Sequence, residues 1–94
     1  MLMVSSETRE IKDIVRDFIT KNYLYWSEHI EIKDNQSLVE EGIIDSTGIL
    51  ELAAFIESTF RITIDDEEFV PKNLDTLNAI GAFILRKTNG KSAD

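Results

Sequence analysis

The stretch Ser37–Phe60, SLVEEGIIDSTGILELAAFIESTF, decides the fold of this chain. It joins a charged, glycine-containing loop to apolar residues at positions 49, 52, 53, 56 and 60, which is the spacing of one face of an α-helix. Counting back along this face places Asp45 at or near the N-cap and Ser46 on the first turn. A serine there lies beside unpaired backbone N–H groups and the positive end of the helix dipole, an environment that favours a phosphate ester.

The composition indicates one small globular domain of 94 residues, with loose ends at about 1–5 and 89–94. Hydrophobic residues make up 43% of the chain, which argues against disorder. The absence of cysteine excludes disulfides, thiolate metal sites and a thiol nucleophile. No apolar run is long enough to span a membrane, and no signal-peptide core is present, so we expect a cytoplasmic monomer without membrane insertion.

The negative charge is concentrated around Ser46. Between Val39 and Glu68 there are nine acidic residues and one basic residue, Arg61, a net charge of −8 that equals the charge of the whole chain. The rest of the sequence is therefore neutral. Such a field repels nucleic acid and anionic membranes and attracts basic protein surfaces. A purely solubilising role for this surface is the alternative interpretation.

Helical periodicity recurs on both sides of the central stretch, and the chain therefore predicts an all-α four-helix bundle with a long first loop. The first helix is expected from Glu7, capped by Ser5 or Ser6, to about Asn22. The second is expected from Ser46 to Thr59 or Phe60. A short turn at 65–69 ended by Pro71 follows, and a last helix, capped by Asn73 or Asp75, runs to about Lys87 and stops at Asn89-Gly90. The expected inner positions of the first and last helices are Ile11, Ile14, Val15, Phe18, Ile19, Leu77, Ile80, Ile84 and Leu85.

The connection between the first two helices, residues 23–45, is long for a compact domain and needs anchors in the core. Its apolar residues can supply them: Tyr23, Tyr25, Trp26, Ile30, Ile32, Leu38, Val39, Ile43 and Ile44. His29 is the only histidine, and without a second histidine or a cysteine nearby it does not predict a metal site.

Ser46 does not match a catalytic nucleophile. A nucleophilic serine needs a base and a group that orients the base, and the sequence gives His29 no reason to approach it. The Gly-x-Ser-x-Gly motif is absent because position 44 is isoleucine. We therefore expect no catalytic residues and no metal, and taken alone Ser46 could be an ordinary cap serine of an acidic helical interaction module.

The motif and its flanks resemble the acyl carrier protein family. The similarity rests on Glu41-Gly42-Ile43-Ile44-Asp45-Ser46, followed by Glu51-Leu52 and Phe60. Most fatty-acid-type carriers have leucine after the serine, whereas this chain has Thr47. The Asp-Ser-x-Gly form, with Glu67-Glu68-Phe69 and Thr76-Leu77-Asn78-Ala79-Ile80 downstream, is closer to D-alanyl and other aminoacyl-type stand-alone carriers.

The resemblance implies a non-catalytic carrier. A phosphopantetheinyl transferase would attach a 4′-phosphopantetheine arm from coenzyme A to Ser46, near which Asp45 would lie, and the arm's thiol would hold cargo as a thioester. By family position, the partner-facing residues are Thr47, Leu50, Glu51, Ala54 and Glu57. The implied partners are this transferase, an activating ligase and downstream acyl-using enzymes with basic docking surfaces.

The cargo stays open between a fatty or other acyl chain, as in fatty acid or secondary metabolite biosynthesis, and an amino acid loaded by an adenylating ligase. An acyl chain would need an expandable apolar space beside Ile49, Ala53, Ile64 and Phe69, whereas a small amino acid would not. A third possibility, from a different class, is a non-carrier acidic interaction module.

Overall fold

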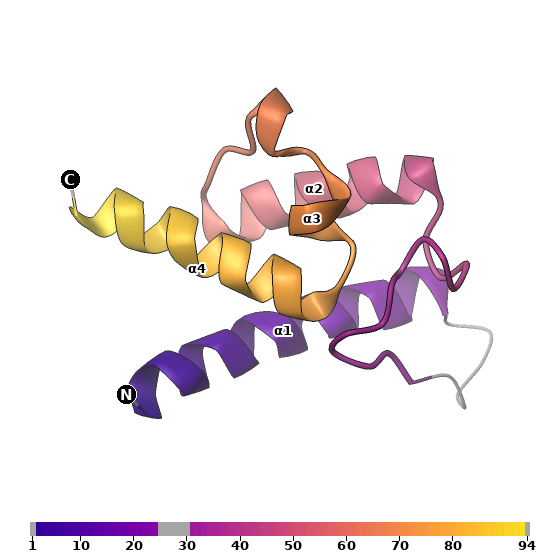
Figure 1. Cartoon of the computed structure of the whole chain (residues 1–94), viewed down its shortest axis with the longest axis horizontal. Helices are drawn as coiled ribbons and strands as arrows, with labels where there is room; N and C mark the ends of the chain where they lie inside the picture. The colour runs from indigo at the N-terminus through magenta and orange to yellow at the C-terminus, as the bar shows by residue number, and fades with distance from the viewer. Residues whose placement is uncertain (1, 25–30, 94) are drawn as a thin grey trace.

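The computed structural model describes residues 2–24 and 31–93, and within these ranges all regular structure is helical. The elements are α1 (Leu2–Tyr23), α2 (Ser46–Phe60), η1 (Asp66–Glu68), α3 (Pro71–Leu74) and α4 (Leu77–Ala93). Helix α4 packs against α1, and α3 packs against α4, with α2 completing the bundle (Figure 1). The predicted all-α bundle with three longer helices is confirmed; η1 is the predicted short turn, and α3 is an additional one.

The core lies between the three longer helices and the loop before α2. Its most deeply buried side chains, with no exposed surface, are Val15, Ile19, Leu38, Leu52, Ile56, Leu77, Ile80 and Ile84. Burial of one such side chain contributes about 1.5–3 kcal/mol to folding. Phe18 of α1 stacks on Phe55 of α2 with ring centroids 4.1 Å apart, which fixes how these two helices face each other.

Two apolar side chains differ from the predicted stripes. Ile14 is 41% exposed, although the spacing placed it with Val15 on the buried face of α1. Phe83 is almost fully buried and belongs to the core, although it was not among the expected inner positions of α4. Both differences arise because the apolar face that a helix buries depends on how its neighbours pack, and the sequence period alone does not fix the centre of that face.

Both end helices are longer than predicted. Helix α1 begins at Leu2, so Ser5 and Ser6 lie inside it and do not cap it. Residues 2–6 contain no glycine or proline that would oppose a helix. Helix α4 likewise continues through Asn89 and Gly90 to Ala93, since a single glycine weakens a helix by only about 1 kcal/mol.

Helix α2 occupies the predicted range. It ends at Phe60, and Arg61 follows in the left-handed conformation (φ 58°) with its backbone N–H donating to the Glu57 carbonyl. Residues 61–64 then form a connector, as predicted. The Glu57 carboxylate accepts a hydrogen bond from the Ile64 backbone N–H (2.7 Å), so this side chain fastens the connector to the last turn of α2.

The predicted boundaries after the connector were wrong at two places. Pro71 is the first residue of α3 and does not end a helix, because its fixed φ and missing N–H suit a first helical position. Thr76, and neither Asn73 nor Asp75, caps α4, since its hydroxyl oxygen accepts a hydrogen bond from the Ala79 N–H (3.0 Å). Asn73 lies within α3, and Asp75 has a different role, described below.

Two bases of α1 hold the segment that leads toward α2. Lys12 Nζ donates to Asp34 Oδ2 (2.9 Å) and to Asn78 Oδ1 at the start of α4 (3.1 Å), and Arg16 also pairs with Asp34. These donors, with Lys12 first, hold the pKa of the Asp34 carboxyl below its usual range. Lys12 therefore connects α1 to both the loop and α4, and Arg16 connects α1 to the loop.

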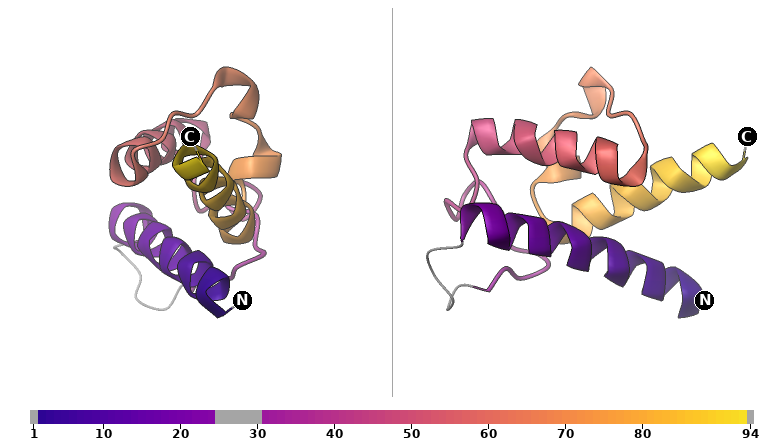
Figure 2. Two further views of the ribbon diagram at one scale, coloured as in Figure 1. Left: turned by 90° about the vertical axis from the view of Figure 1, so that its left-hand side faces the viewer. Right: turned by 180° about the vertical axis from the view of Figure 1, so that it is seen from behind.

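The start of α2 lies beside the end of α1, at the opposite end of the bundle from both chain termini (Figures 1 and 2). Over residues 2–24 and 31–93, no helix combines the length and the apolar character needed to cross a membrane. Of the loop anchors predicted from sequence, Ile32, Leu38, Ile43 and Ile44 are buried, whereas Val39 is 48% exposed. Tyr25, Trp26 and Ile30 lie outside the described residues, as does His29.

Candidate functional site

Ser46 is the first residue of α2 and its side chain is exposed. Asp45 is the N-cap, as the sequence predicted: its backbone is extended and its Oδ1 accepts a hydrogen bond from the Gly48 N–H (2.8 Å). The Asp45 carbonyl accepts the first helical bond, from the Ile49 N–H (3.0 Å). This cap leaves Ser46 and Thr47 among the first-turn amides that have no partner within the helix.

Gly48 allows the first turn of α2 to pack closely against the rest of the bundle. A Cβ at this position would lie 2.6 Å from Ile44 Cγ2 and 3.3 Å from Tyr23 Cε1. Ile44 is branched at Cβ and only 2% exposed, so it cannot easily move aside. The glycine of the Asp-Ser-x-Gly motif thus has a steric explanation, since a larger residue would push the serine-bearing turn outward.

Asp75 fixes the loop that leads into Asp45. Its carboxylate accepts hydrogen bonds from the Ser37 hydroxyl and from the Val39 N–H (3.1 Å), and its carbonyl accepts one from the Leu38 N–H (2.8 Å). The loop then turns through Gly42, whose positive φ of 74° suits glycine. The loop before α2 is therefore attached to the junction between α3 and α4, and through that junction to the core.

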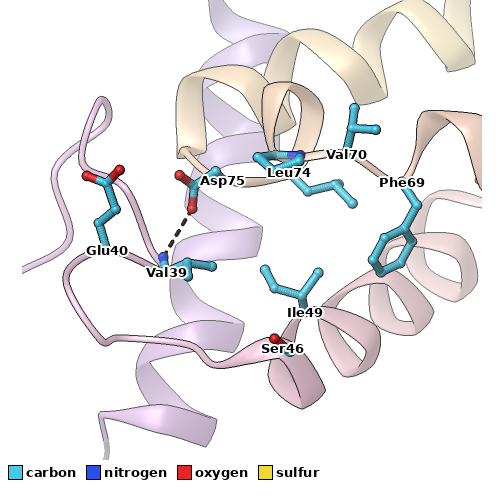
Figure 3. A pocket seen from close by; sticks show the side chains of 9 residues that line it. Val39, Glu40, Ser46, Ile49, Phe69, Val70, Leu74 and Asp75 are labelled. Atoms are coloured by element: carbon cyan, nitrogen blue, oxygen red, sulfur yellow. Dashed lines mark hydrogen bonds between the residues drawn. The ribbon is translucent and has the colours of Figure 1, made fainter.

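A pocket of about 390 Å³ opens beside Ser46 (Figure 3). Ser46 and Ile49 form its α2 side, and Val39 and Glu40 of the loop form a second side. The remaining lining residues come from the segment between η1 and α4: Phe69, Val70, Pro71, Leu74 and Asp75. The pocket includes two of the residues expected to border a cargo space, Ile49 and Phe69, but neither Ala53 nor Ile64. It is apolar in the main: the Asp75 carboxylate is turned toward the loop, where it binds the Val39 N–H, and the Glu40 side chain points away from the pocket (Figure 3).

The residues expected to face partners differ in exposure. Thr47, Glu51 and Ala54 are exposed, and Leu50 is 60% exposed, which is unusual for a leucine. Glu57 is half-buried because its carboxylate is held by the Ile64 amide. The first four residues therefore offer side-chain surface on α2, whereas Glu57 combines a surface position with a structural contact.

Tyr23, at the end of α1, hydrogen-bonds to α2. Its hydroxyl donates to the Glu51 carboxylate. Burial, and then this hydrogen bond and the negative charges of Glu51 and Asp45, raise the pKa of Tyr23 to about 12. A tyrosine hydroxyl is protonated at neutral pH, so the donor in this hydrogen bond is uncharged.

Among the residues that the structure describes, no group of three or more metal-ligating side chains comes together. Sequence reasoning missed Asp75 and the pocket residues Val70 and Leu74. Asp75 looks like a helix cap locally, and its bond to Ser37, 38 positions earlier, has no local signal. In the sequence, Val70 and Leu74 are apolar residues near Pro71 that look like ordinary core positions. Only the arrangement of η1 and α3 beside Ser46 identifies them as pocket residues.

No protein-family model matches the chain. Curated relatives are found in Streptococcus suis, where the proteins of strains 05ZYH33 and 98HAH33 are both described as a D-alanyl carrier protein. Each is 31% identical to this chain over 71 residues, which is 76% of this chain and 86% of the relative.

Proposed function

The chain belongs to the acyl-carrier type of carrier proteins, and on that premise we propose that Ser46 is the attachment point of a 4′-phosphopantetheine arm. The observation that carries the proposal is the exposed hydroxyl of Ser46 on the first turn of α2, at the edge of a pocket. When attached, the arm supplies a terminal thiol that can hold cargo as a thioester. A chain without cysteine has no thiol of its own for this purpose.

The residues around Ser46 fit a phosphodiester. The first-turn amides and the positive end of the dipole of α2, a helix of 15 residues, favour an anionic group on Ser46. The Asp45 carboxylate accepts a bond from Gly48, which holds it at the cap and keeps it near the serine. We propose that Asp45 assists the transferase there, as its place in the Asp-Ser motif implies.

We infer that an amino acid is the cargo that the pocket suits best. The relatives are named for D-alanine, and two acidic residues, Glu40 and Asp75, stand beside the pocket, where their negative charge would attract the ammonium group of an aminoacyl thioester. A fatty acyl chain would gain nothing from these charges. It remains the second candidate because Ile49, Phe69, Val70 and Leu74 present apolar surface in the same pocket.

The exposed side of α2 suits basic partners. Thr47, Leu50, Glu51 and Ala54 offer a small surface of mixed character, with Glu57 at its end, within the acidic part of the chain. We propose that the transferase and an adenylating ligase dock here through basic surfaces. Attraction between exposed charges accelerates encounters and is screened by salt, so arm attachment should slow as salt concentration rises.

Intact-mass spectrometry tests the proposal directly. The chain is incubated with coenzyme A and a promiscuous phosphopantetheinyl transferase, and the expected result is a mass gain of one arm that Ser46→Ala abolishes. A matched control is Ser58→Ala, which removes an exposed serine near the other end of α2 and should leave the gain unchanged. An unmodified wild-type chain would refute the carrier role at Ser46.

The cargo is tested on the loaded chain. Offering aminoacyl and fatty acyl groups in competition through promiscuous ligases should give the aminoacyl thioester, and Glu40→Gln should reduce this preference. A preference for the fatty acyl group in the wild-type chain would instead favour the second candidate.

A further inference from the structure

Tyr23, at the end of α1, lies beside the first turn of α2. Its ring is half-buried, and its Cε1 atom lies 3.3 Å from the place where a Cβ on Gly48 would stand. The same ring meets Phe18 edge-on, with centroids 6.3 Å apart and an interplanar angle of 68°. Phe18 in turn stacks on Phe55 of α2. The ring of Tyr23 therefore lies between Phe18 of α1 and the Gly48 turn of α2, packed against the core.

The Tyr23 hydroxyl, which the packed ring keeps in place, fixes the orientation of the Glu51 side chain. Glu51 is exposed and lies on α2 five residues after Ser46, so without a partner its carboxylate would sample several rotamers. The hydrogen bond from Tyr23 selects one orientation. Because the donor is neutral, the carboxylate stays charged, whereas a lysine or arginine in the same place would cancel that charge.

We propose that Tyr23 is a positioning residue for partner docking, which it serves by holding the Glu51 carboxylate in one orientation for a basic surface of the partner. Ordering a free glutamate when a complex forms costs binding free energy, and a side chain already ordered avoids that cost. The inference rests on the proposed function, because the partner in question is the transferase that modifies Ser46.

A double-mutant cycle on arm attachment tests it. Tyr23→Phe keeps the ring and removes the hydroxyl, and Glu51→Gln removes the charge. We expect Tyr23→Phe to raise the KM of the transferase for the carrier by about three- to tenfold with kcat unchanged. Glu51→Gln should raise it by at least as much, and adding Tyr23→Phe to Glu51→Gln should change nothing further.

Glu57→Gln provides the matched control. The Glu57 carboxylate is held by the Ile64 amide and has no bond to Tyr23, so the effects of Tyr23→Phe and Glu57→Gln should multiply independently. A KM unaffected by Tyr23→Phe would overturn the proposal. So would an equal loss with and without Glu51, or a loss confined to kcat, because each of these would mean that the hydroxyl does not act through this carboxylate.

A second measurement needs no transferase and separates this inference from the carrier role. The side-chain order parameter of Glu51, measured by NMR, should be high in the wild-type chain and fall in Tyr23→Phe, while that of Glu57 stays constant. A Glu51 side chain that is equally mobile in both chains would overturn the positioning role even if Ser46 gains the arm. A wild-type chain that gains no arm would overturn the carrier role and, with it, the docking purpose of this contact.

Discussion

The carboxylates around α2 and those on the rest of the bundle are held by different kinds of donor. Near Ser46, Asp45 accepts from a backbone N–H, Glu51 from a tyrosine hydroxyl and Asp75 from a serine hydroxyl and a backbone N–H. Elsewhere, Asp34 is bound by Lys12 and Arg16, and Glu68 by Lys87. The first group is held by neutral donors, and the second group is paired with cations.

This difference separates geometry from charge. A neutral donor fixes a carboxylate and leaves its charge in place, whereas a cation fixes it and cancels the charge. The acidic field around Ser46 can therefore coexist with well-defined side-chain positions. The cation-paired carboxylates lie partly exposed, so solvent screens each pair and keeps its contribution to stability small.

Among the carboxylates held by neutral donors, removal of Asp75 should lower the stability of the fold the most. Asp75→Ala leaves the Ser37 hydroxyl and the Val39 N–H without their acceptor, and we expect a loss of about 1–3 kcal/mol in the free energy of unfolding, measured in urea. Asp75→Asn is the control: it keeps an oxygen for the Val39 amide and should lose less. Unfolding of Asp75→Ala at the wild-type urea concentration would show that the loop does not depend on this residue.

Substitutions of Asp45 separate the contribution of helix capping from that of negative charge at a single residue. Asp45→Ala removes the cap of α2 and should cost about 1 kcal/mol, measured by thermal or urea unfolding. Asp45→Asn keeps a cap of similar quality and removes the charge, so its stability should stay within a few tenths of a kcal/mol while arm attachment slows. If both variants attach the arm at the wild-type rate, the charge at this position has no role in loading.

The cation-paired carboxylates should affect the stability of the fold at acidic pH. Lys12, with Arg16, lowers the pKa of Asp34 from its ordinary 3.8, and Lys87, with the Asp65 amide, lowers that of Glu68 from 4.5. A lowered folded-state pKa means that the contribution to stability is present above these ordinary values and is lost as the pH falls through the folded-state pKa. The free energy of unfolding, measured in urea across an acidic pH series, should therefore fall less steeply with decreasing pH in Asp34→Asn than in the wild type. An equal pH dependence in the two chains would mean that the pairing of Asp34 makes no measurable contribution to stability.

The smallest effect belongs to Tyr23 and lies in alkali. Its pKa is raised from 10.0 to about 12, so its contribution to stability is present below pH 10 and is lost as the pH rises toward 12. Tyr23→Phe should remove this part of the alkaline transition, followed by circular dichroism, and lower the neutral-pH stability only slightly, because the hydrogen bond that it removes is exposed to solvent. An alkaline transition identical in both chains would contradict the assigned pKa shift.

The sequence predicted the parts of the site whose causes are local. The cap at Asp45 and the range of α2 follow from one polar residue before an apolar face, and both are confirmed. Ile43 and Ile44 were rightly placed in the core. These features depend on residues a few positions apart, which a periodic pattern records.

The features that the sequence did not predict depend on distant contacts. Asp75 bonds to Ser37, and Lys12 bonds to Asp34 and Asn78, across 38, 22 and 66 positions respectively. Nor could the pattern tell that Pro71 would begin a helical turn, because proline both ends one helix and suits the first position of the next. The pocket beside Ser46 depends on one of these contacts, because Asp75 both lines the pocket and bonds to Ser37.

Asp75 has one more consequence, for the mechanics of the pocket. Its bonds to residues 37–39 clamp the loop wall, with Val39 and Glu40, to the wall of Leu74 and Asp75. The pocket is therefore closed on the side of Asp75. If the pocket holds the cargo, as the proposed function implies, a bulkier cargo would require it to widen between Ile49 of α2 and Phe69, and the space between these two side chains would limit the size of the cargo.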